Sequence, residues 1–192
     1  AGAIHILAIS GLHIGILLFF FKTILSPMSR FKNGKIIQLL LLISLLWLYA
    51  LVAGMSPSVV RAVTMFSFVG VGIYLRRYTS IYNTLACSIL IILLFKPNFL
   101  FDVGFQLSYS AVFAIVSIQP LFTKLWKPQN KIVSYFYDIL TVSFAAQIGV
   151  LPLSIYYFHQ FPGLFFLTNL VIIPMLTIIL IGGIIAVLFS FF

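Results

Sequence analysis

Long runs of apolar residues, separated by short polar or turn-forming stretches, dominate the hydrophobic pattern of this chain. Seven such runs can be counted, at roughly 4–25, 36–54, 57–75, 80–95, 103–123, 133–158 and 163–191. Most are close to the roughly 20 residues that an α-helix needs to cross a lipid bilayer. Because the apolar residues are near-continuous and do not alternate with polar ones, the runs predict helices and not the strands of a membrane barrel.

The breaks between the runs carry residues typical of helix ends. Ser56 is followed by Pro57, which predicts a helix start, because serine caps a first turn and proline is tolerated where its missing N–H is not needed. The fourth run is short for a full crossing, and Pro152 and Pro174 interrupt the last two runs. We therefore predict an all-α fold, a polytopic transmembrane helix bundle of about seven hydrophobic segments, some broken or re-entrant.

The composition supports a membrane protein. Of the 192 residues, 63% are hydrophobic and only 7% are charged, which is more apolar surface than a soluble domain of this size buries. The single cysteine, Cys87, argues against a disulfide framework and against a cysteine-based metal site. We expect one domain over residues 1–192. A polar motif appears almost at once and the last run ends abruptly, so we also expect a fragment of a longer protein.

The basic residues are unevenly distributed between the loops. If Ala1 starts outside, nine of the eleven Lys and Arg residues lie on the cytoplasmic side: Lys22, Arg30, Lys32, Lys35, Arg76, Arg77, Lys124, Lys127 and Lys131. The positive-inside rule therefore predicts that the N-terminus of this chain is outside. The net charge of +9 then needs no special partner, because basic loops beside anionic lipid are ordinary in membrane proteins.

The first run carries polar and small residues where lipid favours leucine and isoleucine. His5, Ser10 and His13 form one broad face of a helix, and polar groups inside a membrane usually face a bundle interior or a water-filled path. Gly11 and Gly15 form a small-x-x-x-small pair, which lets a second helix approach closely. The alternative is that the glycines only pack helices and the polar side chains only bond to neighbouring backbone.

Arg61 is the most unusual residue of the third run, because it lies about one turn inside a predicted membrane helix. Asp102 begins the fifth run on the same predicted side of the membrane. We predict an ion pair between the two near the outer mouth. The alternative is that Arg61 extends to the outer headgroups and Asp102 only caps its helix.

Further polar residues recur at helical spacing on the later runs. On the fifth run they share one face: Asp102, Gln106, Tyr109, Ser110 and Ser117. Gln147 on the sixth run has Ser143 one turn before it. Around a shared axis these residues would line a hydrated path, and the alternative is hydrogen bonding between helices without a lumen.

Catalytic and metal-binding patterns find little support. Ser10 lacks a Gly-x-Ser-x-Gly context, and the eight-residue spacing of His5 and His13 does not match the His-Glu-x-x-His metal motif. Asp102 and Asp138 are the only acidic residues, which leaves almost no acid–base repertoire. We therefore expect no enzyme activity, no cofactor and no metal in this chain.

Three motifs together resemble the ComEC-type competence proteins, the DNA internalisation proteins of the bacterial inner membrane. They are His5-Ile-Leu-Ala-Ile-Ser-Gly-Leu-His13, Ser58-Val-Val-Arg-Ala62 after Pro57, and Asp102-Val-Gly-Phe-Gln-Leu-Ser108, in the family's order. The positions that match the motifs are His5, Ser10, Gly11, His13, Arg61, Asp102, Gly104, Phe105 and Gln106. With Ser110 and Gln147 they are our candidates for lining a DNA path or holding its shape.

The resemblance implies a channel core that passes one DNA strand across the bacterial cytoplasmic membrane during natural transformation. The implied partners are single-stranded DNA, membrane lipid, other competence proteins, a second copy of the chain, and two further domains of the same protein, one OB-like and one metallo-β-lactamase-like. This chain has no His-x-His-x-Asp-His cluster, so the nuclease-like domain is expected elsewhere. Two alternatives stay open: a secondary transporter of a small anionic solute, and a membrane-embedded hydrolase built on Ser10, His13 and Asp102.

Overall fold

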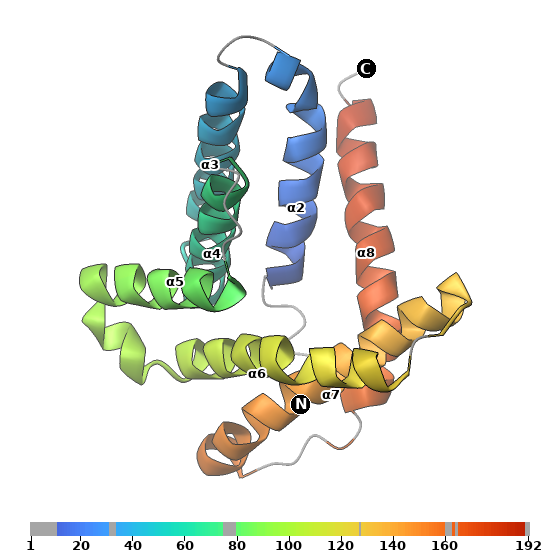
Figure 1. The fold of residues 1–192 in the computed structure, drawn as a ribbon. Coiled ribbons are helices and arrows are strands. Elements are labelled where there is room, and N and C mark those ends of the chain that lie inside the picture. Colours follow the sequence, from blue (N-terminus) through green and yellow to red (C-terminus); the bar gives the residue numbers. More distant parts are fainter. Residues whose placement is uncertain are drawn as a thin grey trace. The chain divides into compact units, whose positions relative to one another are not determined.

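The structure is a computed structural model that describes residues 11–30, 34–74, 80–126, 128–159, 163 and 165–190. These residues form helices and no strand (Figure 1). In chain order the helices are α2 (Gly11–Ile24), η1 (Ser26–Arg30), α3 (Gly34–Val52), α4 (Pro57–Tyr74), α5 (Ile81–Phe95), η2 (Pro97–Phe101), α6 (Val103–Leu125), α7 (Lys131–Phe158) and α8 (Phe165–Ser190). The all-helical prediction is confirmed, and from the second run onward the observed helices match the predicted runs to within about two residues.

Four helices are long and apolar enough to cross a membrane. They are α3, α4, α6 and α7, with 19, 18, 23 and 28 residues. Within the described residues, the apolar parts of α2, α5 and α8 are shorter. The 15 residues of α5 extend about 22 Å at 1.5 Å per residue, less than the roughly 30 Å of a hydrocarbon core. This confirms that the fourth segment is short.

Helices α7 and α8 continue through the two prolines that the sequence had suggested as points of interruption, and α6 contains a third, Pro120. Pro152 lies inside α7 and Pro174 lies inside α8. A proline has no N–H to donate to the carbonyl four residues earlier, so each helix has a weak point but no break.

In α7 the exposed aromatic residues Tyr135 and Tyr156 lie 21 residues apart. That is about 32 Å, the separation expected of the two aromatic belts of one membrane span.

The chain divides into two compact units within α6. The first unit extends to Gln106 and the second begins at Leu107. The first unit therefore holds α2 to α5 with the first turn of α6, and the second holds the rest of α6 with α7 and α8.

Helices α2, α3 and α4 share the core of the first unit. Its buried side chains are Ile14, Leu42, Leu46, Ala50, Val59, Ala62 and Val63, and Figure 1 shows α2 running beside α3. Because lipid tails are as apolar as these side chains, close van der Waals packing holds such helices together.

The turn between α3 and α4 uses the residues that the sequence places there. Gly54 adopts φ +80°, a conformation that favours glycine, and the Met55 N–H donates to the Ala50 carbonyl at 2.9 Å. This is the bond pattern of a glycine-terminated helix end. The Ser56 carbonyl then accepts from the Val60 N–H at 3.0 Å, and Pro57 begins α4 as predicted.

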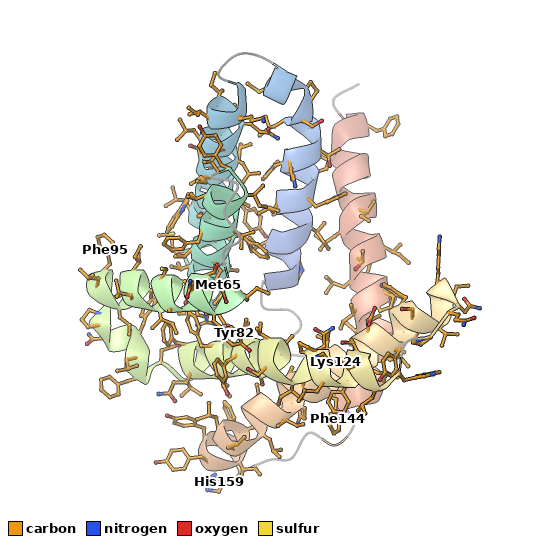
Figure 2. All side chains as sticks on the ribbon, in the orientation of Figure 1. Met65, Tyr82, Phe95, Lys124, Phe144 and His159 are labelled. Atoms are coloured by element: carbon orange, nitrogen blue, oxygen red, sulfur yellow. The ribbon has the colours of Figure 1, made fainter. Side chains whose placement is uncertain are left out.

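Large apolar side chains cover much of the surface. Val52 is 82% exposed, Leu125 78% and Phe95 82%, the last labelled in Figure 2. Soluble proteins rarely present such extensive apolar surface to water. In a chain with four membrane-length helices, these faces fit lipid contact.

Candidate functional site

Arg61 lies inside the protein and not at its surface. It is 3% exposed, in a stretch of α4 where Val59, Ala62, Val63 and Thr64 are also buried, so that this part of the helix is covered on all sides. Its guanidinium carbon lies 5.8 Å from the centroid of the Phe105 ring, a geometry in which the ring quadrupole attracts the cation. The alternative in which Arg61 extends to the outer headgroups does not fit this burial.

Asp102 caps the start of α6. Its Oδ1 accepts a hydrogen bond from the Phe105 N–H at 2.7 Å, and its backbone is extended, with φ −73° and ψ 121°. These are the features of an N-cap residue bonded to the third residue of its helix, as the sequence predicted. A carboxylate is also favoured there by the positive end of the helix dipole.

The other motif residues beside Asp102 complete this helix start. A β-carbon added at Gly104 would lie 3.1 Å from Asp102 Oδ1, so glycine leaves room for the capping carboxylate. Gln106 Nε2 donates to the Leu100 carbonyl at 2.9 Å, which ties α6 back to η2. Phe105, 4% exposed, is the link between this cap and Arg61.

Phe105 thus connects Arg61 with Asp102. Its ring contacts the guanidinium, and its backbone N–H donates a hydrogen bond to the carboxylate. This relationship is less direct than the predicted ion pair, which stays a prediction. Sequence reasoning included Phe105 only as a motif position. It did not anticipate an aromatic ring as the partner of the buried cation.

The glycine pair of the first run lies against α4; its spacing predicted a close second helix but not which one. A β-carbon at Gly15 would lie 3.4 Å from the Phe66 ring, and one at Gly11 would lie 3.9 Å from the Ala62 side chain. The matching four-residue spacing of Ala62 and Phe66 places α2 closely along α4. This contact lies next to Arg61 in sequence. His13 is half-buried on α2, whereas His5 and Ser10 lie outside the described residues.

In the second unit, Ser110 joins α6 to α7. Its hydroxyl donates to the Gly149 carbonyl. A β-carbon at Gly149 would lie 2.6 Å from the Ser110 carbonyl oxygen and would overlap the Ala114 side chain. Gly149 was not among the predicted site residues. Its four-residue spacing from the fully buried Ala145 is a small-x-x-x-small pattern that could have found it.

Farther along the same pair of helices, aromatic side chains make the contact. Phe122 and Phe144 pack edge to face at 5.4 Å (Figure 2 labels Phe144), and the Tyr137 hydroxyl donates to the Phe122 carbonyl at 2.9 Å. Residues early in α7 therefore meet residues late in α6, and Gly149, late in α7, meets Ser110, early in α6. The two helices pack antiparallel.

The opposite face of α7 carries Gln147. Ser143, 2% exposed, accepts a hydrogen bond from Asn169 Nδ2 of α8 at 3.2 Å. Gln147 follows Ser143 by one turn on the same face and is 7% exposed. Its Nε2 has no hydrogen-bond partner within the described part of the chain.

The candidate residues therefore fall into two groups. Arg61 of α4 comes together with Asp102, Gly104, Phe105 and Gln106 at the start of α6 in the first unit, and Gly11 of α2 packs against Ala62, the residue after Arg61. Ser110 and Gln147 belong to the second unit and lie on different helix contacts. Across the described ranges, no group of three or more His, Cys, Asp or Glu residues could hold a metal ion.

Comparison with known proteins gives one family and one curated relative. The competence protein family model matches residues 1–192. The chain is 32% identical over 187 residues to ComE operon protein 3 of Bacillus subtilis (strain 168), an alignment that covers 96% of this chain and 23% of that protein. The chain thus spans about a quarter of that relative's length. No solved structure matches the chain significantly.

Proposed function

Because this chain belongs to the competence protein family, we propose that it is the membrane channel core through which single-stranded DNA crosses the bacterial cytoplasmic membrane during natural transformation. Four helices of membrane-spanning length supply the multi-pass frame that such a core needs. We take both units as parts of one membrane domain, with the N-terminus of this chain outside.

The observation that supports the proposal most is the burial of Arg61. A cation inside an apolar bundle is costly and is usually retained for function. Arg61 lies one turn inside α4, and the Phe105 ring at the start of α6 holds its guanidinium. A DNA strand brings one negative charge per nucleotide, and a fixed cation near the outer mouth would lower the cost of its entry.

The motif around Asp102 then serves to position that cation. The Asp102 cap fixes the first turn of α6, and the turn carries Phe105 to its place beneath the guanidinium. We assign Asp102, Gly104 and Gln106 a positioning role, and Arg61 the contact with the strand.

The remaining partners follow from the relative's greater length. We propose that the longer protein adds an OB-like domain and a metallo-β-lactamase-like domain, the latter to degrade the other strand, so that this chain itself is not the nuclease. Membrane lipid surrounds the apolar helix faces. Other competence proteins and a second copy of the chain are further proposed partners.

Arg61→Ala in the full-length protein tests the proposal. We expect entry of labelled DNA into the cytoplasm to fall by about tenfold or more, the equivalent of about 1.4 kcal/mol on a barrier, while DNA bound outside and protein in the membrane stay unchanged. Arg61→Lys should retain part of the activity, because it keeps the charge but loses the planar stacking group.

Lys96→Ala is a matched control for lost positive charge. Lys96 is exposed and its Nζ lies 5.2 Å from the Phe99 ring, so it is also a cation beside an aromatic ring, but at the surface. Normal DNA entry in Arg61→Ala would remove Arg61 from the mechanism. Equal losses of DNA entry in both variants would mean that Arg61 contributes only as one of several positive charges.

A further inference from the structure

The face of α7 that meets α8 contains a buried donor with unused hydrogen-bonding capacity. Gln147 is 7% exposed, and its Nε2 donates no hydrogen bond to the described part of the chain. A donor removed from water without an acceptor costs free energy that an apolar residue of similar shape would not. Packing alone therefore gives no reason for a glutamine here.

Gln147 belongs to a polar seam between α7 and α8, which we define as Ser143, Gln147 and Asn169. A neutral hydrogen bond of 3.2 Å, from Asn169 Nδ2 to Ser143 Oγ, crosses it. On its other side α7 is held tightly to α6, where the Ser110 hydroxyl bonds the Gly149 carbonyl. The backbones of α7 and α8 also approach closely, so the seam can part only if the two helices bend away from each other.

Each helix of the seam has a proline five residues beyond its polar side chain. Pro152 follows Gln147 in α7, and Pro174 follows Asn169 in α8. Each proline leaves the carbonyl four residues before it, that of Ile148 or Leu170, without a helical donor. Both helices are thus easiest to bend directly beside the seam.

We propose that the seam is a closed gate, which parts by bending at the two prolines and presents the Gln147 amide to an oxygen acceptor of the passing DNA strand. The inference rests on the proposed function and adds to it a movable element and a specific contact. Ser143 and Asn169 hold the gate shut, and their groups become further neutral contacts when it opens. A neutral amide suits transit, because it pairs with an oxygen without the strong retention of a fixed charge.

Gln147→Leu in the full-length protein tests the contact. The apolar replacement removes the unused donor, so thermal stability in detergent should stay the same or rise. Entry of labelled DNA into the cytoplasm should fall by about fivefold to tenfold, as expected for one lost hydrogen bond. The matched control is Gln119→Leu, at a half-buried glutamine of α6 in the same unit, which should take up DNA normally. Normal entry in Gln147→Leu overturns the contact.

Cross-linking the seam tests the gate. In a Cys87→Ser background, Ser143→Cys with Asn169→Cys is joined by a short thiol cross-linker that reductant cleaves. DNA entry should stop on cross-linking and return on reduction, and complete cross-linking with unchanged entry overturns the gate. This arm also decides the outcome if Gln147→Leu lowers the amount of protein. If the unaltered protein admits no DNA, the proposed function fails. If the unaltered protein admits DNA and the Gln147→Leu and cross-linked variants admit it equally well, only the gate fails.

Discussion

Replacing Gly149 by alanine should force α6 and α7 apart. The new β-carbon would lie 2.6 Å from the Ser110 carbonyl oxygen and 3.2 Å from the carbonyl carbon. Because both are backbone atoms of a helix, neither can rotate away. To restore an ordinary carbon–oxygen contact of about 3.3 Å, the helices must separate by at least roughly 0.7 Å, and the overlap with the Ala114 side chain requires a larger separation.

The energetic cost of that separation has two parts. Overpacking a close contact costs about 1–3 kcal/mol, and loss of the Ser110–Gly149 hydrogen bond adds about 0.5–1.5 kcal/mol. The higher helix propensity of alanine returns at most about 1 kcal/mol. We therefore expect Gly149→Ala to lower the free energy of unfolding by about 0.5–4.5 kcal/mol.

Thermal unfolding of the full-length protein in detergent measures this loss, and two glycines of α8 provide the control. No atom lies within 4 Å of a β-carbon built at Gly182 or Gly183, so alanine at either should be neutral or stabilising. The variant Ser110→Ala tests the mechanism further. Once the hydroxyl is absent, Gly149→Ala should cost less than it does alone, because the two changes act on one contact. Equal stability of Gly149→Ala and Gly182→Ala would refute the close approach of α6 and α7.

Two further predictions concern the start of α6 and the orientation of the chain. Asp102→Ala should lower the free energy of unfolding by about 1 kcal/mol, because the Phe105 N–H loses its acceptor. Asp102→Asn should lower it less, because the amide oxygen still accepts that hydrogen bond. Equal losses of the two variants in thermal unfolding would count against the cap. In a Cys87→Ser background, Asn98→Cys should react with an impermeant thiol reagent added outside the cell, whereas Asn130→Cys should react only after permeabilisation. The reverse pattern would show that the orientation is inverted.

Local features of the sequence predicted the elements well, because the forces that set them act between near neighbours. The Ser56-Pro57 start of α4 and the Asp102 cap of α6 each depend on residues within one turn of the chain. The close approach of α2 to another helix followed from the four-residue spacing of Gly11 and Gly15 in the same way.

Partners distant in the chain could not be predicted in this way. Opposite charge predicted Asp102 as a partner of Arg61, and this ion pair stays a prediction, but nothing in the sequence indicated the Phe105 ring, whose centroid lies 5.8 Å from the guanidinium carbon. The choice depends on which atoms of the α6 start face α4, and that direction is fixed by packing and not by residue type. Likewise, the sequence marked Ser110 as a residue that lines a path or holds its shape, but it could not give the partner of its hydroxyl, the Gly149 carbonyl 39 residues away.

The hydrogen bonds within the chain identify several polar residues that hold helices and turns in place. Asp102, Gln106, Ser110 and Ser143 each bond within the chain, so polarity alone does not mark a path. A strand crossing a hydrocarbon core of about 30 Å would bring in on the order of nine charges, at the 3.4 Å per nucleotide of duplex DNA. Away from their first and last turns, the four membrane-length helices carry one cation, Arg61, and one charge cannot offset nine. The path we propose therefore requires water, together with further cations from the rest of the longer protein or from a second copy.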